Sequence, residues 1–195
     1  MAFTNLDTKE INCKIVYFGP SAAGKTENLR SIYANSAEEM KSGLMELDDG
    51  KGSTKFFDFL PISLGYVKDY HIKLHLFSLP LSNLFETVTS VLLKGLDGII
   101  FIADSRFSRL GANIEELEKT KETLKDEGYR FSDLPQVIQY NKRDLADVIS
   151  VEALRKELNP YHVPEYQAIA SQSVGTMETL HLMAKQVLLN LAPKN

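Results

Sequence analysis

The sequence GPSAAGKT at residues 19–26 decides the fold, because it matches the pattern G-x-x-x-x-G-K-[ST] of a phosphate-binding loop. An apolar run at residues 11–18 precedes it, and a segment of helical character at residues 24–33 follows it. The glycines let backbone N–H groups converge on phosphate oxygens, and the amino-terminal end of the helix adds a partial positive charge. Strand, loop and helix in this order predict a nucleotide site of the P-loop type.

Two side chains of this loop have predicted roles toward a nucleoside triphosphate. Lys25 is expected to reach the β- and γ-phosphates, and the hydroxyl of Thr26 is expected to coordinate Mg²⁺. The alternative is a glycine-rich turn that binds nothing, which the flanking strand and helix disfavour. The residues predicted to bind phosphate are Gly19, Ser21, Ala22, Ala23, Gly24, Lys25 and Thr26.

A second motif, NKRD at residues 141–144, follows a predicted strand at residues 136–140 and has the form N-K-x-D. A carboxylate at Asp144 can accept hydrogen bonds from both N1–H and the exocyclic amine of guanine, a donor pair that adenine lacks. Asn141 is expected to brace the loop, and the stem of Lys142 is expected to pack along the ring. With a weaker third element after the last strand, the residues predicted to bind guanine are Asn141, Lys142, Asp144, Ala170 and Ser171.

The rest of the chain alternates apolar runs with longer amphipathic stretches. We predict strands at residues 11–18, 54–60, 71–77, 98–103, 136–140 and 166–170, and helices at residues 24–33, 83–94, 115–127, 150–158 and 176–191. Residues 61–70 are expected to connect an antiparallel hairpin, and residues 37–53 to form a mobile loop or short helix. This pattern predicts an α/β protein in which helices flank both faces of a mostly parallel central sheet. We expect one domain over residues 1–195, with a polar extension at about residues 1–10.

The composition excludes several classes of protein. The 195 residues are 44% hydrophobic and 25% charged, as in an ordinary globular domain, and the net charge of −4 without a basic stripe argues against nucleic-acid binding. Cys13 is the single cysteine of the sequence, so no internal disulfide is possible, which fits a reducing compartment. No apolar run reaches the length of a membrane span, and the sequence has no prenylation or myristoylation signal. We expect a cytoplasmic protein without a direct membrane anchor.

Four stretches of the sequence carry a family resemblance that covers nearly the whole chain. They are KIVYFGP at 14–20, FFDFLP at 56–61, GLDGIIFIADS at 95–105 and NKRDL at 141–145. With them the chain resembles Ras-like small GTPases and, more closely, the bacterial MglA group, which controls cell polarity and motility. The resemblance implies the P-loop NTPase (small GTPase) fold and a GTP/GDP switch with Mg²⁺. It also implies binding to a roadblock-type activator and a response-regulator-like polarity protein, with recruitment to a cell pole by such partners.

Three positions depart from the family pattern. Typical members read T-V-P-G-Q where this chain reads SLPLS at residues 78–82, so Leu81 replaces a glycine that contacts the γ-phosphate and Ser82 replaces the glutamine that orients the attacking water. Ser53 stands where the family carries an arginine finger in cis. Such an arginine is worth roughly 10³–10⁵ in rate, or about 4–7 kcal/mol. We therefore expect binding with weak or absent intrinsic hydrolysis, and we assign no catalytic residue.

The switch and metal residues leave alternatives open. Thr54, Leu81 and Ser82 are the predicted switch residues, and Thr54 joins Thr26 as a predicted Mg²⁺ ligand. Asp58 either holds a metal-bound water or caps a strand end. The run DSR at residues 104–106 suggests a structural or switch-adjacent role. Instead of a weakly hydrolysing switch, the chain could be an active GTPase completed by a partner in trans, or another P-loop protein such as a nucleotide kinase.

Overall fold

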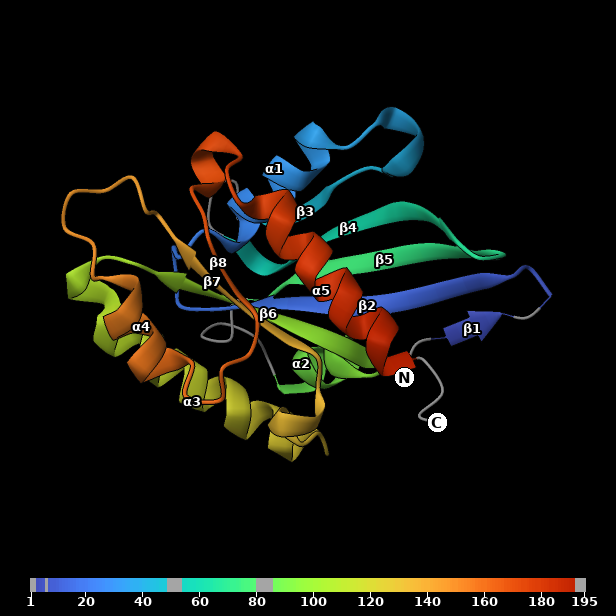
Figure 1. The fold of residues 1–195 in the computed structure, drawn as a ribbon. Coiled ribbons are helices and arrows are strands. Elements are labelled where there is room, and N and C mark those ends of the chain that lie inside the picture. Colours follow the sequence, from blue (N-terminus) through green and yellow to red (C-terminus); the bar gives the residue numbers. More distant parts are fainter. Residues whose placement is uncertain (1–2, 6, 49–53, 80–85, 192–195) are drawn as a thin grey trace.

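The computed structural model describes residues 3–5, 7–48, 54–79 and 86–191 and builds them around one sheet (Figure 1). The strands are β1 (Phe3–Asn5), β2 (Glu10–Phe18), β3 (Met45–Asp48), β4 (Thr54–Val67), β5 (Tyr70–Ser78), β6 (Leu96–Asp104), β7 (Gln136–Asn141) and β8 (Glu165–Gln167). The helices are α1 (Lys25–Asn35), α2 (Glu86–Leu93), α3 (Leu110–Asp126), α4 (Val151–Leu158) and α5 (Thr176–Leu191). Short 3₁₀ turns are η1 (Glu38–Met40), η2 (Phe107–Arg109), η3 (Phe131–Asp133) and η4 (Ala170–Gln172).

The sheet is mostly parallel, as predicted, with strand order β3-β4-β5-β2-β6-β7-β8. Strand β2 lies in the middle and runs parallel to both β5 and β6, while β3 and β4 are antiparallel additions at one edge. From β2 the chain continues to β3, β4 and β5 on one side, and after β5 it crosses to β6 on the other side of β2. The carboxyl end of β2 therefore lies at a topological switch point, where ligands of open α/β sheets bind. The loop at residues 19–26 follows β2 directly and therefore lies at this point.

Helices cover both faces of the sheet. Alternate residues of β2 face opposite layers, so Ile15 packs in the core with α1 and α5, whereas Val16 packs in the core with α2, α3 and α4. Figure 1 shows α5 crossing over the strands and α3 and α4 together on the other side. All nine residues of β6 are buried, because this central strand has a helical layer on each face.

The structure corrects several expected boundaries. Residues 37–53 were expected to be a loop or short helix, but they contain both η1 and the edge strand β3. The hairpin connection is much shorter than residues 61–70, because β4 continues to Val67 and pairs up to Tyr70. Pro61 fits inside β4 because it lies beyond Phe59, the last residue there that pairs with β3.

Smaller differences occur elsewhere in the chain. Helix α3 begins at Leu110 rather than at residue 115, and the final strand is reduced to β8, so that Ala170 belongs to η4. Residues 83–85 of the expected second helix lie outside the described residues. Within the polar extension expected at about residues 1–10, β1 pairs antiparallel with the start of β2. The single-domain organisation over residues 1–195 stays a prediction.

Candidate nucleotide-binding site

The loop at residues 19–26 has a shape that requires its two motif glycines. Gly24 caps α1 with φ of 105°, in the left-handed region, and a Cβ there would lie 2.2 Å from Nδ2 of Asn141. Gly19 has φ of 138°, and a Cβ there would lie 2.2 Å from the carbonyl oxygen of Ile102. Both positions therefore exclude any side chain, and they allow the loop to pass close to β6 and to the loop after β7.

The carbonyl groups of the loop are all held by side chains. Each carbonyl from Gly19 to Ala23 accepts a hydrogen bond from an ammonium, guanidinium or amide nitrogen. In a trans peptide the C=O and the N–H point in opposite directions, so the held carbonyls of Pro20, Ser21 and Ala23 turn the N–H groups of Ser21, Ala22 and Gly24 away from these side chains. Pro20 has no N–H, and the N–H of Ala23 donates to the carbonyl of Pro20 at 3.1 Å. The three remaining N–H groups can line a cradle for an anion. The donors are Lys25 to Gly19 (2.6 Å) and Pro20 (3.0 Å), Arg109 to Ser21 (2.9 Å), Lys142 to Ala22 (2.6 Å) and Asn141 to Ala23 (2.8 Å).

Lys25 is buried beneath the loop, although it carries the charge expected to meet the phosphates. Burial lowers its pKa from 10.5 to about 8, and the carboxylates of Glu116 and Asp58 partly offset this effect. Two neutral carbonyls are weak partners for a buried ammonium, whereas phosphate oxygens would supply full negative charge. The side chain therefore fits a triphosphate better than it fits its present partners.

The residues predicted to bind guanine line one open cavity of about 170 Å³ beside the loop. Asn141, which is buried, connects the three segments around it, since its side chain donates to Ala23 and accepts from the backbone N–H of Ala170 at 3.0 Å. Asp144 is exposed and therefore free of the desolvation cost that a buried carboxylate would carry. The residues lining the cavity are Gly24, Glu27, Asn141, Lys142, Asp144, Leu145, Ala170 and Ser171.

A buried carboxylate at the end of β6 fixes Lys142. Asp104 is fully buried and accepts from the guanidinium of Arg106 at 3.0 and 2.6 Å and from the ammonium of Lys142 at 2.8 Å. Burial raises the pKa of Asp104, but the bonds from Arg106 and Lys142 outweigh it and hold the pKa at about 2. The carboxylate thus stays charged and holds Lys142 between the phosphate loop and the base cavity.

Three oxygen-bearing side chains meet on the other side of the loop. The hydroxyl of Thr26 donates to the carboxylate of Asp58 at 2.6 Å, and Asp58 lies opposite Ser78 in the pairing of β4 with β5. The hydroxyl of Ser78 is buried and has no hydrogen-bond partner among the described residues. Hard oxygen donors of this kind suit Mg²⁺. Groups of three or more His, Cys, Asp or Glu side chains that could hold a metal are absent from the described residues.

The remaining predicted switch residues cannot be placed in the site. Thr54 begins β4 opposite Asp48, but only its backbone is described. Ser53, Leu81 and Ser82 lie outside the described residues. Their roles, and the Mg²⁺ role of Thr54, stay predictions.

Comparison with known proteins decides the family. Over 191 residues the chain is 46% identical to the mutual gliding-motility protein MglA of Myxococcus xanthus (strain DK1622), and the match covers 98% of each chain. The chain belongs to the MglA family of small GTPases. No family model matches the sequence. None of the helices that the structure describes is both long and apolar enough to cross a membrane.

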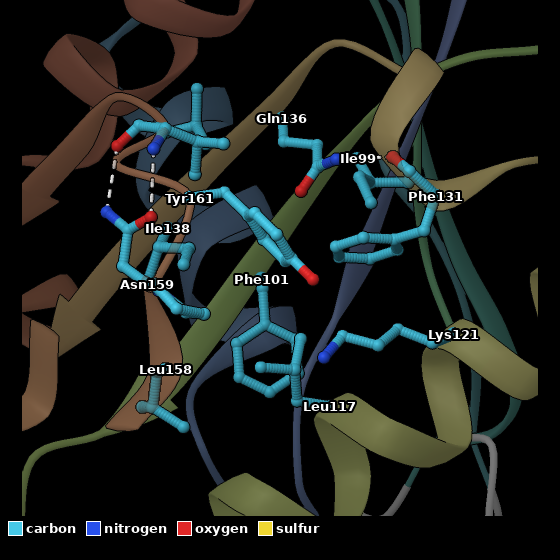
Figure 2. A pocket seen from close by; sticks show the side chains of 13 residues that line it. Ile99, Phe101, Leu117, Lys121, Phe131, Gln136, Ile138, Leu158, Asn159 and Tyr161 are labelled. Atoms are coloured by element: carbon cyan, nitrogen blue, oxygen red, sulfur yellow. Dashed lines mark hydrogen bonds between the residues drawn. The ribbon is translucent and has the colours of Figure 1, made fainter. Parts of the chain in front are cut away.

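A second hollow, between β6, β7, α3 and the segment after α4, holds none of the residues predicted for the MglA-type site (Figure 2). Its volume of about 10 Å³ has room for roughly one water molecule. Figure 2 shows the amides of Asn159 and Gln136 already bonded, to Val163 and Phe131. Lys121 at its edge pairs with Glu118. This hollow is therefore a packing defect of the core rather than a ligand site.

Sequence reasoning missed several residues that shape the MglA-type site. Glu27 and Leu145 line the base cavity, and Arg109 holds the phosphate loop. Asp104 was not missed, because it ends an apolar strand at the ligand-binding edge of the sheet and the run at residues 104–106 was expected to have a structural or switch-adjacent role. Arg109 follows five positions later in a segment without a motif, so only the folded chain brings it to Ser21.

Proposed function

We propose that this protein is a guanine-nucleotide-binding molecular switch that acts in cell polarity or motility through GTP-dependent binding of partner proteins. The observation that carries the proposal is that the phosphate loop, whose carbonyls are held by side chains, adjoins the cavity around Asn141 and Asp144. The relative from Myxococcus xanthus is named for gliding motility, which supports a role of this kind.

The choice of guanine over adenine is the first part to test. Asp144→Ala should weaken GDP binding by at least about tenfold, since it removes the acceptor for two guanine donors. The matched control is Asp126→Ala at the exposed carboxyl end of α3, which should bind GDP like the wild type. Competition between GTP and ATP for the wild-type protein completes the test. Equal competition by ATP would refute a guanine switch and favour a nucleotide kinase.

Weak or absent intrinsic hydrolysis is the second part of the proposal. It is supported by Ser53, Leu81 and Ser82, which replace the arginine finger, the glycine and the glutamine of related GTPases. Loss of an arginine finger alone costs roughly 10³–10⁵ in rate. Single-turnover hydrolysis on GTP-loaded protein tests this, and a rate equal to that of ordinary small GTPases would contradict it. The alternative is an active GTPase completed by a partner in trans, in which case a cognate activator would restore that rate.

Mg²⁺ is the expected cofactor beside GTP or GDP. Thr26 and Thr54 are the proposed ligands, and Asp58 is placed to accept from Thr26 or from a metal-bound water. When bound, the ion would neutralise charge on the phosphates.

The proposed partners and location follow from the resemblance to the MglA group. We propose a roadblock-type activator and a response-regulator-like polarity protein as partners of one cytoplasmic domain over residues 1–195, with recruitment to a cell pole by such proteins. Pull-down from a lysate with GTP-loaded and GDP-loaded protein tests this. Equal capture of every partner by the two forms would rule out a nucleotide-dependent switch.

A further inference from the structure

Arg109 connects the start of α3 to the phosphate loop. It ends η2 and caps α3, and its Nη2 donates a 2.9 Å hydrogen bond to the carbonyl of Ser21. Its Nε is buried and has no acceptor among the described residues. The inner end of the guanidinium is thus buried within the protein, while Nη2 at its outer end reaches the loop.

The peptide that Arg109 contacts needs to be held in place. It joins Ser21 to Ala22, and Ala22 has φ of 60°, a left-handed conformation that is uncommon for a residue with a Cβ. Such backbone persists where surrounding bonds fix it. Arg109 holds the carbonyl before Ala22, and Lys142 holds the carbonyl of Ala22 itself at 2.6 Å.

The start of α3, which carries Arg109, is fixed to the end of β6. Asn113, one turn further along α3, is fully buried and bonds the backbone of Asp104 twice, accepting from its N–H at 2.9 Å and donating to its carbonyl at 2.8 Å. The start of α3 is therefore tied to the end of β6, and a guanidinium presented from it has a defined position. Charge-assisted hydrogen bonds of this kind are stronger than those between neutral groups.

We propose that Arg109 is a positioning residue for the phosphate loop, which turns the Ser21 carbonyl outward and so directs the N–H of Ala22 at the phosphate chain. This inference rests on the proposed nucleotide site. Among the described loop residues, Gly24 lines the base cavity, so the nucleoside lies at that end of the loop. Ala22 lies further along, where the second phosphate of a nucleotide arrives. Arg109 should therefore affect nucleoside diphosphates and triphosphates but not monophosphates.

The test compares dissociation constants for GDP and GMP in Arg109→Ala, Arg109→Lys and wild-type protein. We expect Arg109→Ala to weaken GDP binding about tenfold and to leave GMP binding within about twofold. Arg109→Lys keeps a charged donor for the Ser21 carbonyl and should recover most of the GDP affinity. The control is Arg130→Ala, because Arg130 is exposed and pairs with Asp133 at the surface.

Other outcomes overturn the inference. Unchanged GDP binding, an equal loss for GMP and GDP, or no recovery in Arg109→Lys would each show that Arg109 does not position the loop for the second phosphate. If Arg109→Ala does not fold, Arg109→Gln replaces it, with a neutral donor and a smaller loss expected for GDP alone. Failure of wild-type protein to bind GDP would instead refute the proposed function.

Discussion

The hydroxyl of Thr26 donates a 2.6 Å hydrogen bond to the carboxylate of Asp58, a residue 32 positions later in the chain. Thr26 lies in the first turn of α1, and Asp58 is almost completely buried on β4. The bond therefore links the phosphate loop to the strand that begins at Thr54, the predicted switch residue. A displacement of Thr26 can therefore displace Asp58 and β4, and a displacement of β4 can displace Thr26.

Asp58→Asn should raise the Mg²⁺ concentration needed to retain bound GDP by about tenfold, because it removes the negative charge beside Thr26 while keeping the shape. Release of a fluorescent GDP analogue over a series of Mg²⁺ concentrations measures this. Asp126→Asn, an exposed change on α3, serves as the control. If the two variants need the same Mg²⁺, Asp58 only accepts the bond from Thr26 and takes no part in holding the ion.

Asp104→Asn should destabilise the protein by about 2–4 kcal/mol at pH 7, because it leaves Arg106 and Lys142 without their shared carboxylate. Bonds from these cations hold the pKa of Asp104 at about 2, below its usual value of 3.8, in spite of its burial. Its contribution is therefore complete above about pH 4 and is lost as the pH falls toward 2. Urea unfolding at pH 7 and pH 3 checks this, and a difference between variant and wild type that does not shrink at pH 3 would speak against it.

Gly24→Ala should abolish nucleotide binding and cost at least about 2 kcal/mol of folding free energy, because the new Cβ would lie 2.2 Å from Asn141 on a left-handed backbone. The matched control is Gly111→Ala on α3, where a Cβ meets nothing within 4 Å. That change should stabilise the protein by about 0.5–1 kcal/mol, since alanine favours a helix. Thermal and urea unfolding measure both, and a Gly24→Ala protein as stable as the wild type would contradict the geometry.

Lys25→Met should stabilise nucleotide-free protein by about 1–3 kcal/mol at pH 7, because it removes a buried charge. It should also prevent GDP retention, because it removes the ammonium that is predicted to bind the phosphates. Since burial lowers the pKa of Lys25 to about 8, the stability of the wild type should rise with pH from about 8 toward 10.5. Lys25→Met should lack this rise. Urea unfolding between pH 7 and 9.5 tests it, with Lys185→Met on the exposed face of α5 as control. If the stability of Lys25→Met and that of Lys185→Met rise equally with pH, groups other than Lys25 cause the pH dependence.

The sequence predicts well those strands and helices whose apolar residues follow a clear pattern. Strands β2 and β6 contain the apolar runs at residues 15–18 and 99–103, because helices cover both faces of these central strands, and α5 begins and ends at the predicted residues. Strand β3 was missed because an edge strand, with Met45 exposed and Glu46 paired to Arg30, needs no apolar run. The length of β4 was missed because Pro61 interrupts the pattern, although Pro61 lies beyond the residues that pair with β3, so β3 requires no N–H from it.

The sequence by itself determined the P-loop fold, the guanine motif and the membership of the MglA family, because these depend on short runs of residues whose chemistry is local. Only the tertiary structure decided how the loop carbonyls are held, since Arg109, Lys142 and Asn141 reach it from segments that are remote in the chain. The same holds for the contact between Thr26 and Asp58. Hydrogen bonds between distant segments depend on strand order and helix packing, and no local pattern encodes which side chains that packing brings together.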